Sequence, residues 1–132
     1  NLELFCDKAD VKLAELTKKM QSFKGTKIIA YHNEWVYFEQ RFGLHIMDFL
    51  EPKPGIPPTP SQLAKVINAM KHDGMKIIIS SPYFKTESAE LVARNTGAKV
   101  VVLATSVGAN EQVQSYFDLF DYNINQLLHA LK

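Results

Sequence analysis

The chain has 132 residues and a net charge of +1, with 46% hydrophobic and 22% charged residues. This length is that of one domain, and the composition is typical of a globular protein with a core of its own. The near-zero charge, without a basic run, gives no indication of nucleic acid or an acidic membrane surface as a partner. The single cysteine, Cys6, excludes an internal disulfide, and no apolar stretch approaches the ~20 residues of a membrane helix.

The first predicted element is a helix over residues 2–23. Apolar side chains recur there at the i, i+3, i+4 and i+7 positions of an amphipathic helix, and Gly25 marks its end. We find no capping residue ahead of Leu2. The helix is therefore expected to continue a longer one.

A β-branched run predicts a strand over residues 27–31, which hands over to a helix at His32. We expect Asn33 to cap a helix over residues 33–42, with Glu34 in the first turn, where the helix dipole favours a carboxylate. In an open α/β sheet, ligands bind outside the carboxyl ends of the strands. His32 is therefore the first candidate for a functional residue.

The middle of the chain continues the alternation of strands and helices. A strand over residues 44–50 is interrupted by Asp48, and the stretch 51–60 has five prolines, which favour a rigid extended loop. A helix follows over residues 61–73. The apolar residues 76–80 are typical of a central strand that is buried on both faces.

The last third of the chain continues the alternation of helices and strands. A helix is predicted over residues 86–95, an apolar strand over 99–103, a loop of small residues over 104–110, and an amphipathic helix over 111–131. Strands that alternate with helices predict an α/β fold, with a four-stranded parallel sheet and helices on both faces.

This Rossmann-like lobe brings the residues after each strand to one edge of the sheet, which we name the carboxyl rim. Its members are His32, Glu51, Ser81, Tyr83, Thr105 and Ser106. The glycine-rich phosphate motifs and the G-x-S-x-G nucleophile elbow are missing. A Ser81–His32 catalytic pair lacks a third member. A divalent ion held by His32 and Glu51 is the better interpretation.

Four segments resemble the C-terminal lobe of the zinc/manganese ABC-transporter solute-binding proteins, a family of metal-binding lipoproteins and adhesins. The segments are YHNEWVYFEQRFGL, LEPKPGIPPTPSQLAKVINAMKHDGMKIIISSPYF, TGAKVVVLATSVG and YFDLFDYNINQLLHAL. The resemblance implies two lobes joined by one rigid helix, with the metal held between them. Residues 1–24 would then be the end of the connecting helix, and residues 25–132 the C-terminal lobe.

The resemblance also implies metal ligands, of which one is present. His32 matches the first histidine of this lobe, whereas Ser81 and Thr105 fall where the family often has acids. Either Glu34 or Glu51 replaces the lost acids, or the metal is bound weakly, or the lobe takes a different ligand. Tyr83 and Ser106 would line the site. We expect the chain alone to bind divalent ions no tighter than about micromolar.

The function implied is that of a periplasmic or extracytoplasmic receptor, with a membrane anchor as an option for the whole protein. It would carry zinc or manganese to a membrane permease, with an N-terminal lobe as its other partner and without enzyme activity. The alternative is a degenerate lobe used for protein–protein contact or for a non-metal ligand.

Overall fold

The computed structural model describes all 132 residues, as five α-helices, one short 3₁₀-helix and four β-strands. The helices are α1 (Leu2–Met20), α2 (Val36–Phe42), α3 (Pro60–Asp73), α4 (Glu87–Thr96) and α5 (Tyr116–Leu131). The strands are β1 (Lys27–Ala30), β2 (His45–Phe49), β3 (Ile77–Ser80) and β4 (Lys99–Val102), and the 3₁₀-helix η1 is Gln21–Phe23. The predicted alternation is confirmed.

The four strands form one parallel sheet in the order β2-β1-β3-β4. The chain leaves β1 toward β2 on one side and then crosses back to β3 on the other side. The strand order therefore reverses between β1 and β3, and such a switch point is where open α/β sheets bind ligands. His32 follows β1 and Ser81 follows β3, so these two residues lie on either side of it.

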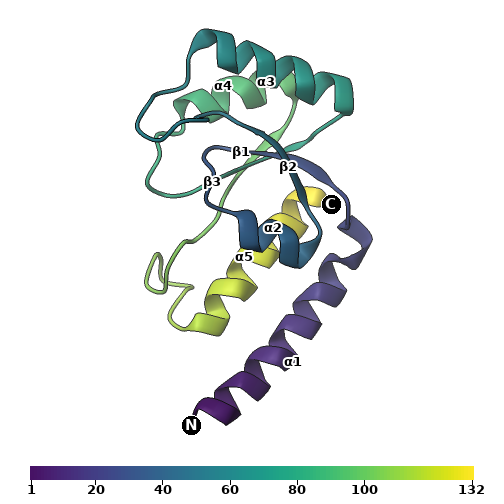
Figure 1. Ribbon diagram of the computed structural model, residues 1–132, viewed down its shortest axis with the longest axis vertical. Helices are drawn as coiled ribbons and strands as arrows, with labels where there is room; N and C mark the ends of the chain where they lie inside the picture. The colour runs from purple at the N-terminus through teal and green to yellow at the C-terminus, as the bar shows by residue number, and fades with distance from the viewer.

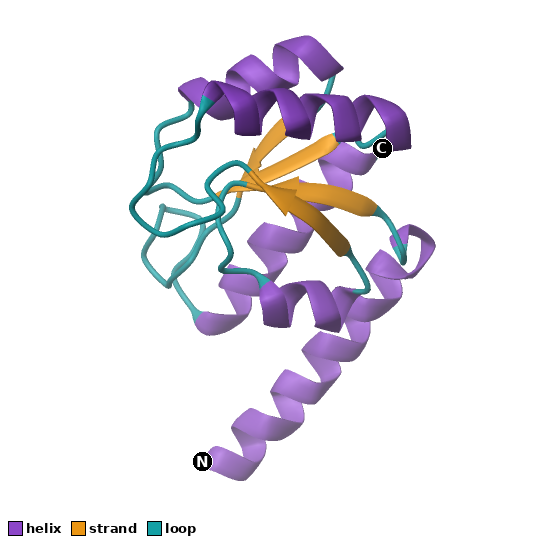
Figure 2. Ribbon diagram, turned by 45° about the horizontal axis from the view of Figure 1, so that its top comes forward, coloured by secondary structure: helices purple, strands orange, loops and turns teal.

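Helices cover both faces of the sheet (Figure 2). Alternate residues of each strand point to opposite faces. Ile28 and Ile79 accordingly belong to the core under α1, α2 and α5, while Ile29 and Ile78 belong to the core under α3 and α4. The predicted fold class, a parallel sheet with helices on both faces, is confirmed.

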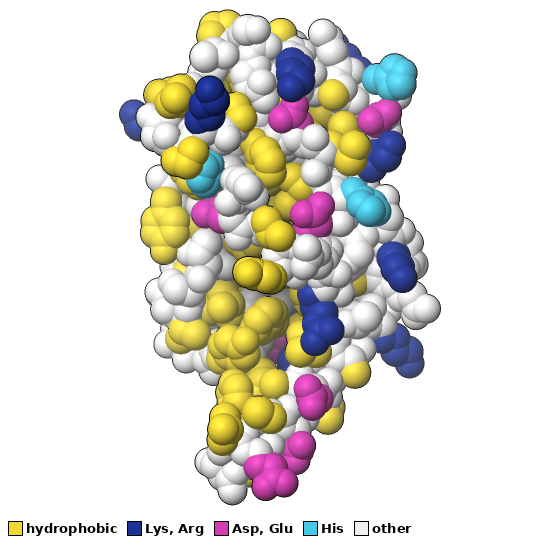
Figure 3. Space-filling view, in the orientation of Figure 1, with side chains coloured by type: hydrophobic (Ala, Val, Ile, Leu, Met, Phe, Trp, Pro, Cys, Tyr) yellow, Lys and Arg dark blue, Asp and Glu magenta, His cyan; other side chains and the backbone are white.

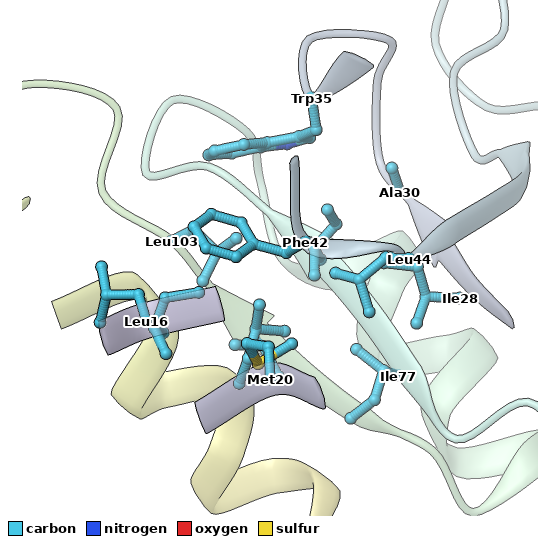
Figure 4. Packing of buried hydrophobic residues seen from close by; sticks show 13 residues of the cluster. Leu16, Met20, Ile28, Ala30, Trp35, Phe42, Leu44, Ile77 and Leu103 are labelled. Carbon is cyan, nitrogen blue, oxygen red and sulfur yellow. The ribbon is translucent and has the colours of Figure 1, made fainter. Parts of the chain in front are cut away.

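Helix α1 reaches the core of the lobe through its last turns, while its first turns contact α5, where the ring centroids of Phe5 and Phe117 are 5.5 Å apart. Leu16 and Met20 are fully buried and pack near Phe42 and Leu103 (Figure 4). The first half of the helix projects beyond the rest of the molecule (Figure 1), and Leu2 is 78% exposed. The helix thus has one end in the core and one end free of it.

We expect Leu16→Ala to lower the free energy of unfolding by about 3 kcal/mol, because it opens a cavity in the core. The matched control is Leu2→Ala, which removes the same atoms from an exposed site and should change the stability by less than about 0.5 kcal/mol. Urea denaturation measures both. Equal effects of the two variants would show that α1 is not held by this core.

The ends of α1 and α5 differ from the prediction. Asn1 caps α1, since its side chain accepts hydrogen bonds from the backbone N–H groups of Glu3 and Leu4, at 2.9 and 3.4 Å. The predicted lack of a cap is therefore wrong. Helix α5 begins at Tyr116 rather than at residue 111, because Ser115 and Asp118 form a capping box.

Apolar side chains gather on the surface over the start of α1, the start of α5 and α2, in the lower half of Figure 3. They surround a groove of about 530 Å³, whose lining includes Leu13, Phe38, Phe117 and Phe120. None of the helices combines the length and the apolar character that crossing a membrane requires.

Candidate functional site

The sheet ladder continues past the ends of the strands and sets the order of residues along the carboxyl rim. Tyr31 donates its N–H to the carbonyl of Ile79, and Glu51 donates to the carbonyl of Tyr31, both at 2.8 Å. Ala30 is paired with Phe49 and Ile79. Two residues further along the same register, His32 lies between Glu51 and Ser81.

The His32 ring is half-buried and held by one hydrogen bond. Its Nδ1 lies 3.1 Å from the backbone carbonyl oxygen of Glu51. A carbonyl only accepts hydrogen bonds, so Nδ1 carries the proton of the neutral ring, and Nε2 keeps its lone pair. Metal-binding histidines have this arrangement, in which the second nitrogen donates to a carbonyl or carboxylate.

The segment between His32 and α2 is a turn on the rim rather than the start of a helix. Glu34 donates its N–H to the carbonyl of His32 at 3.1 Å, and Trp35 occupies the N-cap position of α2 without a side-chain cap bond. The prediction that Asn33 caps a helix and Glu34 lies in its first turn is therefore wrong. Both side chains are exposed.

Glu51 supports the rim through its backbone and its side chain. Its carboxylate Oε1 accepts a hydrogen bond from the N–H of Gly55 at 3.2 Å, which closes the start of the proline-rich loop.

Burial raises the pKa of the Tyr31 hydroxyl above its usual value, and the negative charge of Glu51 raises it further. Tyr31 therefore stays protonated at neutral pH, and its ring stacks on Phe84 at 4.5 Å.

Two buried polar side-chain atoms, one of them in the rim residue Ser81, have no hydrogen-bond partner. Ser81 is 1% exposed and its Oγ makes no hydrogen bond, and the same is true of Nε1 in Trp35, a residue that is 7% exposed. Buried polar groups are nearly always paired, so such groups call for an explanation. Sequence reasoning placed Ser81 on the rim but missed the indole of Trp35.

Two other rim residues, Thr105 and Tyr83, are joined by a hydrogen bond between uncharged side chains. Thr105 lies 3.0 Å from the hydroxyl of Tyr83, to which its Oγ1 donates, and Tyr83 is 73% exposed. Ser106 is exposed. The loop that carries Thr105 is fixed from α5, where the buried Asn123 side chain bonds both the N–H and the carbonyl of Ala104.

The rim brings few metal-binding groups together. Nowhere in the chain do three or more His, Cys, Asp or Glu side chains come close enough to hold an ion between them. His32 is the one rim residue with a nitrogen lone pair free for a metal.

The fold and this rim define an α/β ligand-binding lobe, with its candidate site at the switch point of a parallel sheet. Comparison with known families is consistent with that class: the model for the zinc-uptake complex component A, periplasmic, matches residues 1–130. The chain belongs to this family. The family is described by a role in uptake rather than by a reaction, which agrees with the expectation of a binding protein.

Curated relatives include high-affinity zinc uptake system proteins ZnuA. The protein of Brucella abortus is 25% identical over 132 residues, which is all of this chain and 39% of the relative. That of Bacillus subtilis is 27% identical over 124 residues, which is 91% of this chain and 38% of the relative. The chain thus spans about two fifths of the length of these relatives.

Solved structures share the fold. The laminin binding protein Lmb of Streptococcus agalactiae, described as an adhesin with metal transporting activity, superposes with a TM-score of 0.81 at 25% identity. The Mn-bound periplasmic metal binding protein of Candidatus Liberibacter asiaticus superposes with a TM-score of 0.80 at 21% identity. In both cases 98% of this chain covers 50% of the other.

Proposed function

We propose that this chain is the C-terminal lobe of the substrate-binding component of a metal-ion ABC transporter. It would bind zinc or manganese outside the cytoplasm, in the periplasm, and deliver the ion to a membrane permease. Residues 1–24 would be the end of the helix that leads to the N-terminal lobe, and residues 25–132 the lobe itself. Membership of the zinc-uptake family and the metal-binding names of the relatives support this proposal.

The observation that carries the proposal is the orientation of the His32 ring. Its Nδ1 is bound to the Glu51 carbonyl, which leaves Nε2 ready for an ion at the switch point. Protein zinc sites use three or four protein ligands. His32 would supply one of these ligands, so the others would have to come from Glu51, Glu34 or the N-terminal lobe.

Calorimetric titration of the metal-free chain with zinc and with manganese tests the proposal. We expect binding no tighter than about micromolar, and its loss in His32→Ala, because that variant removes the only nitrogen donor of the rim. His45→Ala is the matched control, since His45 is exposed at the opposite end of the sheet and should leave binding unchanged. Absence of heat with either ion would refute metal binding by this lobe alone.

The second candidate function is a lobe that serves protein–protein contact or a non-metal ligand. The uncharged Thr105 favours it, because the family resemblance implies an acid at this position, where Thr105 instead donates a hydrogen bond to the Tyr83 hydroxyl. The same titration separates the two functions. Zinc binding that disappears with His32 supports the transporter component, and unaltered weak binding in His32→Ala supports the alternative.

A further inference from the structure

We propose that the edge of the sheet opposite the carboxyl rim, which we name the amino edge, binds small anions that carry two or more phosphate groups. This surface lies apart from the rim and takes no part in the proposed metal binding. Strands β1, β3 and β4 start at the amino edge, beside the end of α5, which is marked C in Figure 2. A cleft of about 600 Å³ lies there, a size within the range of sites for small molecules.

A lysine stands at the start of each of these three strands. Lys27 and Lys99 are the first residues of β1 and β4, and Lys76 directly precedes β3. The N–H of Lys99 donates to the carbonyl of Lys76 at 2.9 Å, so these two residues are neighbours across the sheet. All three side chains are exposed and line the cleft, as does Lys132 after α5.

The side chains that line the cleft hold little negative charge to balance these lysines. Asp73 is the one acidic side chain in the lining. Its carboxylate lies 3.0 Å from Nδ1 of His72 and 3.8 Å from Nζ of Lys27. The other three lysines of the cleft form no ion pair. Neighbouring like charges repel one another, so an anion with several charges would relieve this repulsion.

Helices α3, α4 and α5 also end at the amino edge, and the carboxyl end of a helix attracts cations. Each of these helices has a basic residue of its own in the last turn, namely Lys71, Arg94 and His129, and none of the three lines the cleft. The N–H groups of Gly74 and Gly97 bond carbonyls in the last turns of α3 and α4. The lysines of the strands add to this balance, and their charge is available to a ligand.

The lining of the cleft indicates the chemistry of the ligand. Ammonium groups are compact point charges with three hydrogen-bond donors each, and they suit phosphate oxygens. The lining contains no aromatic side chain on which a base could stack, and its apolar part is Met75, Ile77, Ala130 and Leu131. These features favour a compact ligand whose surface is mostly phosphate. Such groups occur free in solution and in the headgroups of some lipids.

Inorganic pyrophosphate is the probe for a free anion, and phosphatidylcholine vesicles with and without cardiolipin are the probe for a lipid headgroup. Calorimetry of the metal-free chain should show pyrophosphate binding, which sodium chloride at about 0.5 M should weaken about tenfold, because salt screens exposed charges. Co-sedimentation measures binding to the vesicles. Pyrophosphate binding without co-sedimentation identifies a free anion as the ligand, and co-sedimentation with cardiolipin that pyrophosphate reverses identifies the headgroup.

Two double variants locate the binding. Lys76→Gln with Lys99→Gln should weaken the binding of either probe by about fivefold or more, because two of the four lysines of the cleft lose their charge. The matched control is Lys53→Gln with Lys85→Gln, which removes the same charge from exposed residues on the loops after β2 and β3, at the opposite edge of the sheet. The control should bind both probes as the parent chain does. Thermal unfolding checks that both variants fold.

Equal losses of affinity in the two double variants would overturn the proposal, because binding would then follow the net charge of the chain and not the cleft. Absence of binding of both pyrophosphate and cardiolipin vesicles would overturn it as well. Because these titrations are done without metal, their results are independent of the ion that His32 is proposed to bind.

Discussion

Replacing Ser81 with glutamate is expected to tighten zinc binding by the chain at least tenfold and to destabilise its metal-free form. The register of β1 and β3 places residue 81 beside His32, so the new carboxylate adds a second protein ligand for the ion. The same position is 1% exposed, and burial raises the pKa of a carboxyl group and disfavours its charged form. The melting temperature should therefore fall without zinc and recover when zinc is added.

Calorimetry and thermal unfolding with and without zinc check the Ser81→Glu result. Ser61→Glu, which introduces the same charge at an exposed site on α3, should change neither quantity. An unchanged zinc affinity would show that residue 81 does not reach an ion held by His32.

The second large effect is expected at Asn123, where Asn123→Ala should cost about 3 kcal/mol of stability. The side chain is 4% exposed, accepts from the N–H of Ala104 at 2.7 Å and donates to its carbonyl at 2.8 Å. Removing it leaves two buried backbone groups without partners, each at a cost of about 1–3 kcal/mol. The loop that carries Thr105 loses its attachment to α5.

Urea denaturation measures this loss of stability. Asn125→Ala is the control, because Asn125 is exposed on the same helix. A difference of less than about 1 kcal/mol between the two variants would contradict the interpretation, and it would mean that water replaces both hydrogen bonds of Asn123.

Regular elements could be predicted from the sequence because their periodicity follows from burial. The unbroken apolar run around Ile78 predicted a central strand, and this strand is buried on both faces. Helix starts were harder to predict. The capping box of α5 uses Asp118 where glutamate or glutamine is usual, and α2 begins only after Trp35 has entered the core. Such tertiary packing leaves no local pattern.

The candidate site, too, could be predicted from the sequence only in part. His32 and Ser81 could be placed on the rim from the chain order alone, because parallel strands bring their carboxyl ends to one edge. The bonds that orient the rim could not be predicted. The contact of His32 with the Glu51 carbonyl and the attachment of Ala104 to Asn123 each join residues 19 positions apart. The family resemblance supplied the metal, and all of its ligands, His32 included, remain a prediction.

The unpaired indole of Trp35 can serve as an optical reporter in this molecule. The chain has a single tryptophan, so its ultraviolet-excited emission comes largely from one ring. That ring sits in the core with a free N–H, three residues after His32. A group that pairs with this N–H, or a shift of the turn between His32 and α2, changes the polarity around the ring and hence the emission wavelength. Events at the rim can thus be followed in unlabelled protein at low concentration.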